Sequence, residues 1–176
     1  MADLNPPTWP PAPIRTDRLT LREFEARDRG AFIELHASAQ VNTYLGGPQP
    51  RADLESTVPE IPDRRPGHFA VDLDGAMIGL VLLERRNVGP ATRVRPASGE
   101  IDLGYLFLPD AWGFGYAAEA CAAVLTWFDS AFPGEPVLLV TQSANAGSMR
   151  LAAKLGFVEV ERFEKWGAEQ WFGVRS

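Results

Sequence analysis

The sequence predicts a mixed α/β domain, of the α+β kind, in which a central twisted mixed sheet of about six to seven strands carries helices on both faces. Apolar patterns follow the order strand, one or two helices, three strands, helix, strand, helix and two strands. Such an order lets each helix bury its apolar stripe against a sheet. The 176 residues suffice for one domain with a full core, and the 45% hydrophobic fraction is ordinary for a globular protein.

The first predicted elements lie in the N-terminal third. Residues 14–24 alternate apolar and polar side chains, which predicts a strand, and residues 31–36 place apolar side chains at helical spacing. Gly46-Gly47-Pro48 then breaks the chain. A short helix is expected after this break, at residues 51–58.

A hairpin and an alternation of strands and helices follow. Asp74-Gly75 stands between the apolar runs 68–74 and 76–86, and this dipeptide is the strongest short hairpin signal. The loop 87–98 comes next. The later predicted elements are a strand at 99–108, a helix at 113–129, a strand at 136–141, a helix at 144–155 and closing strands at 157–163 and 170–174.

Charge and hydropathy restrict location and partners. The net charge of −6 argues against nucleic acid, whose binding needs clustered Lys and Arg. No apolar run approaches the roughly 18–20 residues that span a bilayer. Residues 1–13 hold five prolines and predict an extended tail, not a signal peptide, ahead of a single domain at 14–176. We therefore expect a cytoplasmic protein with no nucleic-acid or membrane partner.

Cysteine and histidine usage argues against a metal site. Cys121 is the single cysteine and lies in the apolar run 117–124, so we expect a buried packing thiol and not a nucleophile. His36 and His68 lie far apart and show no ligand spacing. No metal cofactor is predicted.

The most informative segment runs from Leu106 to Ala120, where a strand ends, a glycine-bearing turn follows and a long helix starts. The first turn of a helix has unpaired N–H groups, and its dipole adds partial positive charge. Gly113 and Gly115 let the backbone approach a ligand closely. The combination predicts a cradle for an anion such as a pyrophosphate. Glycine spacing alone is equally well explained by a turn that simply needs glycines, and no P-loop lysine follows.

Two segments occur in order, Trp112-Gly-Phe-Gly-Tyr-Ala117 and then Asn145-Ala-Gly-Ser148 followed by Lys154-Leu-Gly-Phe157. Together they resemble the GNAT (GCN5-related) N-acetyltransferase superfamily, in its RimJ/RimL-like branch. The first resembles the family's acetyl-CoA loop Gln/Arg-x-x-Gly-x-Gly/Ala, with Trp112 in place of Gln/Arg, and the second resembles its Asn-x-x-Ser…Lys-Leu-Gly-Phe segment. The resemblance covers essentially residues 14–174.

The resemblance implies the GNAT fold, acetyl-CoA (coenzyme A) as cosubstrate and no metal. Pantetheine would insert between two splayed strands and pair with the strand backbone, and the N–H near Phe107 would polarise the thioester carbonyl. Homodimers are common among relatives, so a homodimer is compatible with the resemblance. The cofactor-binding residues that the resemblance implies are Leu106, Phe107, Leu108, Trp112, Gly113, Phe114, Gly115, Tyr116, Ala117, Asn145 and Ser148.

Three residues are candidates for catalytic proton transfer. An alkyl amine is protonated at pH 7, so a base must take a proton directly or through water. By the resemblance Asp102 falls where many members have glutamate, and Glu100 lies two residues earlier on the same strand face. Alternatively, both acids only solubilise an exposed face. Many family members use a tyrosine as the acid, but no tyrosine follows Tyr116. In RimL-like members the serine of Asn-x-x-Ser is a candidate instead, so the resemblance implies Ser148 as the donor to the departing thiolate. Tyr105 is expected in the core.

The acceptor stays open. A primary amine on a protein or peptide N-terminus and a small amine, such as an antibiotic, an amino acid or a polyamine, fit equally, because neither residues 41–66 nor residues 87–98 carry a readable code. A non-catalytic acyl-CoA-binding or interaction module on the same fold is the alternative function. A third reading, an ATP-binding protein that uses the glycine loop, would show competition between ATP and acetyl-CoA.

Overall fold

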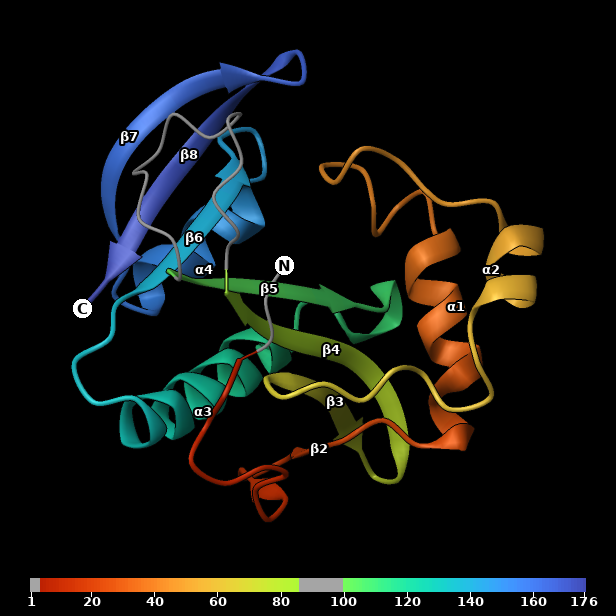
Figure 1. The fold of residues 1–176 in the computed structure, drawn as a ribbon. Coiled ribbons are helices and arrows are strands. Elements are labelled where there is room, and N and C mark those ends of the chain that lie inside the picture. The colour runs from red at the N-terminus through yellow and green to blue at the C-terminus, as the bar shows by residue number, and fades with distance from the viewer. Residues whose placement is uncertain (1–3, 86–99) are drawn as a thin grey trace.

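The computed structural model describes residues 4–85 and 100–176, which form one mixed sheet of eight strands with helices on both faces (Figure 1). The strand order is β1-β2-β3-β4-β5-β6-β8-β7, and β5–β6 is the one parallel pair in it. The predicted mixed α/β class is confirmed. The sheet has more strands than the six to seven predicted, because residues 14–24 form two short strands, β1 (Ile14–Arg15) and β2 (Thr20–Arg22), and not one.

The remaining predicted helices and strands each occur as one element, within a few residues of the expected bounds. The predicted loop at 87–98 lies outside the described residues. The further elements are η1 (Ala26–Asp28), α1 (Arg29–Ala37), α2 (Arg51–Thr57), β3 (His68–Leu73), β4 (Ala76–Arg85), β5 (Ile101–Phe107), η2 (Pro109–Ala111), α3 (Tyr116–Ala131), β6 (Val137–Gln142), α4 (Ala146–Lys154), β7 (Val158–Lys165) and β8 (Ala168–Arg175).

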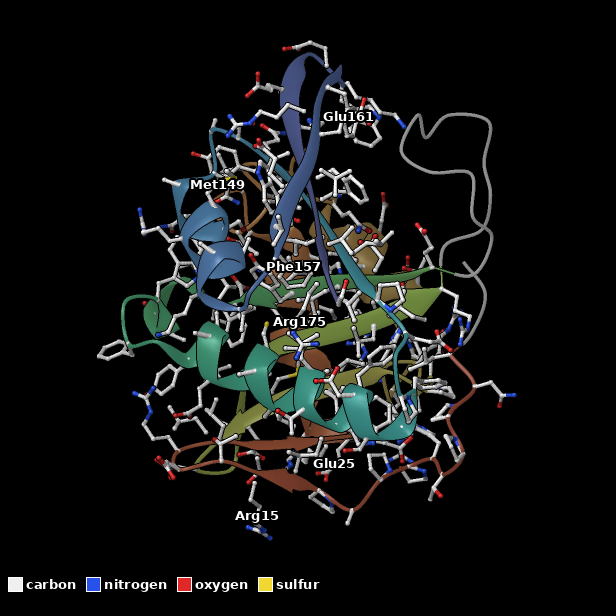
Figure 2. The ribbon with its side chains drawn as sticks, turned by 90° about the vertical axis from the view of Figure 1, so that its left-hand side faces the viewer. Arg15, Glu25, Met149, Phe157, Glu161 and Arg175 are labelled. Atoms are coloured by element: carbon white, nitrogen blue, oxygen red, sulfur yellow. The ribbon has the colours of Figure 1, made fainter. Side chains whose placement is uncertain are left out.

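The larger core lies between the sheet and α3 and α4, the face toward the viewer in Figure 2. One stripe of α3 is buried there, as its spacing predicted: Ala120, Cys121, Val124, Leu125 and Phe128. Cys121 is fully buried, and burial raises the pKa of its thiol, which confirms a packing role. A second core, under α1, includes Leu35 and Leu80.

Buried charge fixes the start of α1. Asp28 is 1% exposed and accepts two hydrogen bonds from the Arg22 guanidinium, at 2.7 and 3.0 Å. Arg22 also donates to Asp72 of β3 at 2.9 Å, and the Asp28 carboxylate raises the pKa of Arg22 above its ordinary value. Because a buried charge is tolerated only when paired, this network holds α1 against β2 and β3. The chain that leaves α1 is thereby positioned as a wall of the site described below.

Residues 4–13 contain no helix or strand, yet they pack against the core. Leu4 is 1% exposed. The Trp9 ring lies 5.3 Å from the Phe69 ring and 5.7 Å from the Trp127 ring, edge to face in both cases. Proline content alone did not predict this packing.

Trp9→Ala is expected to lower the free energy of unfolding by about 2 kcal/mol. This is less than the roughly 3–5 kcal/mol for a fully buried tryptophan, since Trp9 is half-buried. Urea denaturation followed by far-UV circular dichroism measures it. Thr8→Ala, at an exposed neighbour in the same segment, is the control and should leave the midpoint unchanged. Equal midpoints for both variants would show that the Trp9 ring adds no stability.

Candidate active site

The two parallel strands β5 and β6 pair over two residues and then separate (Figure 1). Ile101 pairs with Val137 and Asp102 with Leu138, whereas β5 continues to Phe107 and β6 to Gln142. A cavity of about 790 Å³ lies where they diverge and is lined by residues 103–107 of β5 and 139–141 of β6. Its volume is in the range of sites for organic ligands. This is the splay that the family resemblance implied.

Alternate N–H groups along β5 point to opposite sides of the strand. The Leu108 N–H bonds to the Ile78 carbonyl of β4 at 2.9 Å, so in an antiparallel ladder the Leu106 N–H also faces β4. The N–H groups of Tyr105 and Phe107 therefore face away from β4, on the side of the cavity. This agrees with the donor expected at Phe107. Within the segment 106–108, whose backbone is predicted to pair with pantetheine, the Phe107 N–H is the one that faces the cavity, because the N–H groups of Leu106 and Leu108 face β4.

The glycine loop has the geometry that an anion cradle requires. Gly113 and Gly115 have φ of +84° and +81°, a region that L side chains avoid. Gly115 caps α3 without any side-chain hydrogen bond, and the first intrahelical bond runs from Glu119 N–H to its carbonyl at 3.1 Å. The N–H groups of Tyr116 and Ala117 therefore lack intrahelical partners. The cavity is lined by Gly113, Gly115, Tyr116 and Ala117.

Trp112 ties this loop to the end of β5. Its indole Nε1 donates to the Phe107 carbonyl at 2.8 Å, while 45% of the residue stays exposed. The tryptophan that departs from the general Gln/Arg pattern thus fixes the loop against the strand whose N–H faces the cavity. The neighbouring Phe114 is 57% exposed and stacks on Tyr116.

The start of α4 presents a hydroxyl pair to the cavity. Asn145 accepts from the Ser148 N–H at 3.2 Å, so it is the N-cap that its position predicted. The Ser148 hydroxyl lies 2.6 Å from the Tyr105 hydroxyl, and both residues line the cavity. Burial raises the pKa of Tyr105 to about 12. Sequence reasoning placed Tyr105 in the core, where its ring does pack, but missed its contact with Ser148.

The predicted acids lie at the closed end of the splay. Neither Asp102 nor Glu100, both in the described part of the chain, lines the cavity. Asp102 is half-buried and lies on the same strand face as Gly104, a lining residue. Across the β4–β5 ladder it faces Glu84, which sequence reasoning missed. Glu84 lies 2.7 Å from His68, and this hydrogen bond lowers the pKa of Glu84.

The chain after α1 supplies another wall of the cavity. Val41, Tyr44 and Leu45 line it, and Gln142 of β6 donates to the Tyr44 carbonyl at 3.2 Å. Among the described lining residues the charged side chains are Arg150 and Lys154, both cationic and both on α4. The electrostatic character of the lining is therefore suited to phosphate, not to a multiply charged cation.

Within residues 4–85 and 100–176, no group of three or more His, Cys, Asp and Glu side chains could hold a metal ion. In the same residues no helix combines the length and apolarity needed to cross a membrane.

The comparison with family models identifies the class of protein. The model described as "Acetyltransferase (GNAT) domain" matches residues 18–158, well over half of the chain. The chain belongs to the GNAT acetyltransferase family. A curated relative is the uncharacterized protein YkkB of Bacillus subtilis, 28% identical over 160 residues that cover 86% of this chain and 88% of that protein.

Solved structures share the fold. A GNAT-family acetyltransferase from Bacillus anthracis has a TM-score of 0.76 and 21% identity, covering 93% of this chain and 98% of its own. The aminoglycoside acetyltransferase AAC(6')-Ib in complex with coenzyme A has a TM-score of 0.67 and 16% identity, with coverage of 90% and 94%. RimL, which acetylates ribosomal protein L7/L12, has a TM-score of 0.68 and 12% identity, with 93% of both chains covered. Identities this low show the fold alone, and acceptors differ among these proteins.

Proposed function

We propose that the chain is a cytoplasmic N-acetyltransferase that transfers the acetyl group of acetyl-CoA to a primary amine by direct attack. The observation that carries the proposal is a single cavity that joins the cradle at Gly113–Ala117 to the splayed strands. If the pyrophosphate of acetyl-CoA binds at the cradle, its pantetheine arm can extend along β5, where the Phe107 N–H faces the cavity. The bound cosubstrate supplies an activated acetyl thioester.

The residues around the splay take distinct roles in this reaction. The Phe107 N–H stabilises the oxyanion that forms when the amine nitrogen attacks the thioester carbon. As the C–S bond breaks, the departing thiolate takes a proton from the hydroxyl pair of Ser148 and Tyr105, 2.6 Å apart. Asp102 accepts the proton of the amine. The transfer runs through a water molecule, because Asp102 lies at the closed end of the splay and does not line the cavity. Glu100 adds a second negative charge near Asp102.

The charge of the cavity favours one class of acceptor. No Asp or Glu of the described residues lines it, and the sequence of residues 86–99 contains neither. A polyamine or aminoglycoside carries several positive charges, which need carboxylates once they leave water. Val41, Tyr44 and Leu45 instead offer apolar and hydroxyl surface. We therefore favour an acceptor with one amine and uncharged surroundings, such as a peptide N-terminus, as in the RimJ/RimL-like branch.

The test is thiol release from acetyl-CoA with N-terminal peptides, amino acids, polyamines and aminoglycosides. Turnover is expected with single-amine acceptors. Asp102→Ala is expected to lower the rate about 100-fold at pH 7, and the rate should recover as rising pH deprotonates the amine without a base. Asp53→Ala, at an exposed acid on α2, is the control and should keep the wild-type rate.

Each alternative has its own outcome in the same assay. A wild-type rate in Asp102→Ala would remove Asp102 as the base. Bound acetyl-CoA without turnover on any acceptor would favour the acyl-CoA-binding module. Preferred turnover of polyamines or aminoglycosides would contradict the charge argument.

A further inference from the structure

The strand β7 forms an exposed edge of the sheet. It is last in the strand order, so one of its sides pairs with β8 and the other pairs with no strand of the described residues. The β7–β8 hairpin projects from the body of the molecule, with β7 outermost (Figure 1). Val158 and Val160 on β7 are 69% and 48% exposed, and Trp166 in the turn is 77% exposed. Another strand can pair along an edge of this kind.

The hairpin turn determines which backbone groups of β7 face outward. The turn residues 166–167 have φ of +53° and +73°, which is typical of a two-residue turn whose flanking residues are hydrogen-bonded to each other. Lys165 and Ala168 flank it and form such a pair. Hydrogen-bonded and open pairs alternate along an antiparallel ladder. The N–H and C=O groups of Arg162 and Glu164, which belong to open pairs, therefore face away from β8.

The sequence of this edge is complementary to itself in one antiparallel register. Two copies related by a two-fold axis can pair only where outward-facing residues meet each other, so the axis passes through a residue. With the axis at Phe163, residues of opposite charge meet, and so do the exposed apolar residues at the two ends. The facing pairs are Arg162 with Glu164, Glu161 with Lys165 and Val160 with Trp166, each formed twice.

The neighbouring registers are unfavourable. An axis at Arg162 sets two arginines directly opposite each other, and an axis at Glu164 sets two glutamates opposite each other. Like charges in facing positions destabilise a strand pair, whereas opposite charges stabilise it. The charges of β7 therefore select the register with its axis at Phe163, where two aromatic rings face each other.

The charged side chains of this edge are accessible to a second copy. Arg162 donates to Glu159 at 2.5 Å and to Glu169 at 3.2 Å, and all three side chains are nearly half exposed. Exposed ion pairs of this kind contribute little, so Arg162 can take a further carboxylate. Glu164 is exposed and has no ion pair within the described residues.

The paired segment has a definite length. The register of β7 against β8 shifts between Glu159 and Glu161, and such a bulge interrupts the regular edge. The turn at 166–167 ends the segment on the other side. A segment closed at both ends and paired about a two-fold axis leaves no edge for a third chain, so association stops at two.

We propose that β7 is a homodimer interface, in which two copies of the chain pair antiparallel through residues 160–166 about a two-fold axis at Phe163. The two sheets then form one continuous sheet, joined by backbone hydrogen bonds between Arg162 of each copy and Glu164 of the other. A second copy is the partner that fits, because this one strand carries both members of every charge pair. The interface is independent of the proposed acetyl transfer.

The test is sedimentation velocity of the full chain from about 1 μM to about 1 mM, the range in which small interfaces associate. The wild type should form a dimer as its concentration rises. Arg162→Glu and Glu164→Arg should each raise the dimer Kd at least about tenfold, because like charges then meet at two positions. The double variant Arg162→Glu, Glu164→Arg should restore the dimer, since the exchanged charges are again opposite.

Restoration in the double variant distinguishes the interface from contacts within one chain, because the bonds of Arg162 to Glu159 and Glu169 stay lost. Arg51→Glu, which breaks an exposed ion pair with Glu34, is the control and should dimerise as the wild type does. In the wild type, hydrogen exchange at the N–H groups of residues 162 and 164 should slow as the dimer forms.

A wild type that stays monomeric over the whole range would overturn the interface. Dimerisation that both single variants leave unchanged, or that does not slow exchange at residues 162 and 164, would place the contact elsewhere and overturn it as well. A double variant that folds but stays as weak as the single variants would contradict the register.

Discussion

Gly115→Glu is expected to abolish binding of acetyl-CoA, raising its Kd more than about 100-fold. Gly115 has φ of +81°, where a residue with a Cβ is strained by about 1–2 kcal/mol. The new carboxylate would lie at the start of α3, where the N–H groups of Tyr116 and Ala117 and the helix dipole attract an anion. The protein's own negative charge would thus occupy the cradle and repel the pyrophosphate. Calorimetric titration with coenzyme A measures the loss.

Gly134→Glu is the matched control for strain and charge. Gly134 has φ of +80°, is exposed in the turn between α3 and β6, and has no atom within 4 Å of an added Cβ. The Gly134→Glu variant should bind coenzyme A as tightly as the wild type does. Its loss of thermal stability should be similar to that of Gly115→Glu. Retained affinity in Gly115→Glu, with the fold intact, would remove the cradle as the pyrophosphate site.

The β3–β4 and β7–β8 hairpin turns show which parts of the fold a sequence can predict. Asp74-Gly75 has φ of +53° and +94°, the left-handed pair that this dipeptide favours, and its strands were predicted within a residue or two. Trp166-Gly167 adopts the same kind of turn, with φ of +53° and +73°. Because tryptophan is not a turn residue, the flanking strands were predicted two residues short on each side of this turn.

In the candidate site, too, features that depend on neighbouring residues could be predicted from the sequence, whereas long-range contacts could not. Gly113, Gly115 and Asn145 act through backbone geometry and capping, which depend on nearby residues and can be read locally. The contact of Tyr105 with Ser148 joins residues 43 apart, and that of Arg18 with Phe114 joins residues 96 apart. Such contacts depend on how strands and helices pack, so no local pattern predicts them.

Tyr105→Phe is expected to lower the single-turnover rate of acetyl transfer about 100-fold, the range of general acid catalysis, with little change in acetyl-CoA affinity. The variant removes one hydroxyl and keeps the ring, which packs in the core. Because burial raises the pKa of Tyr105 to about 12, the phenol stays protonated across the assay range. The wild-type rate should therefore show no decline below about pH 11 from ionisation of this group.

Ser148→Ala tests whether the two hydroxyls form one proton-donating unit. If the proton passes through both, each single variant and the double variant should show nearly the same loss, because groups that act as a unit are not additive. Ser130→Ala, at an exposed serine on α3, is the control for loss of a serine hydroxyl and should keep the wild-type rate. Losses that multiply in the double variant would show that the hydroxyls act separately. A wild-type rate in both single variants would assign the pair to packing and leave the thiolate to take its proton from water.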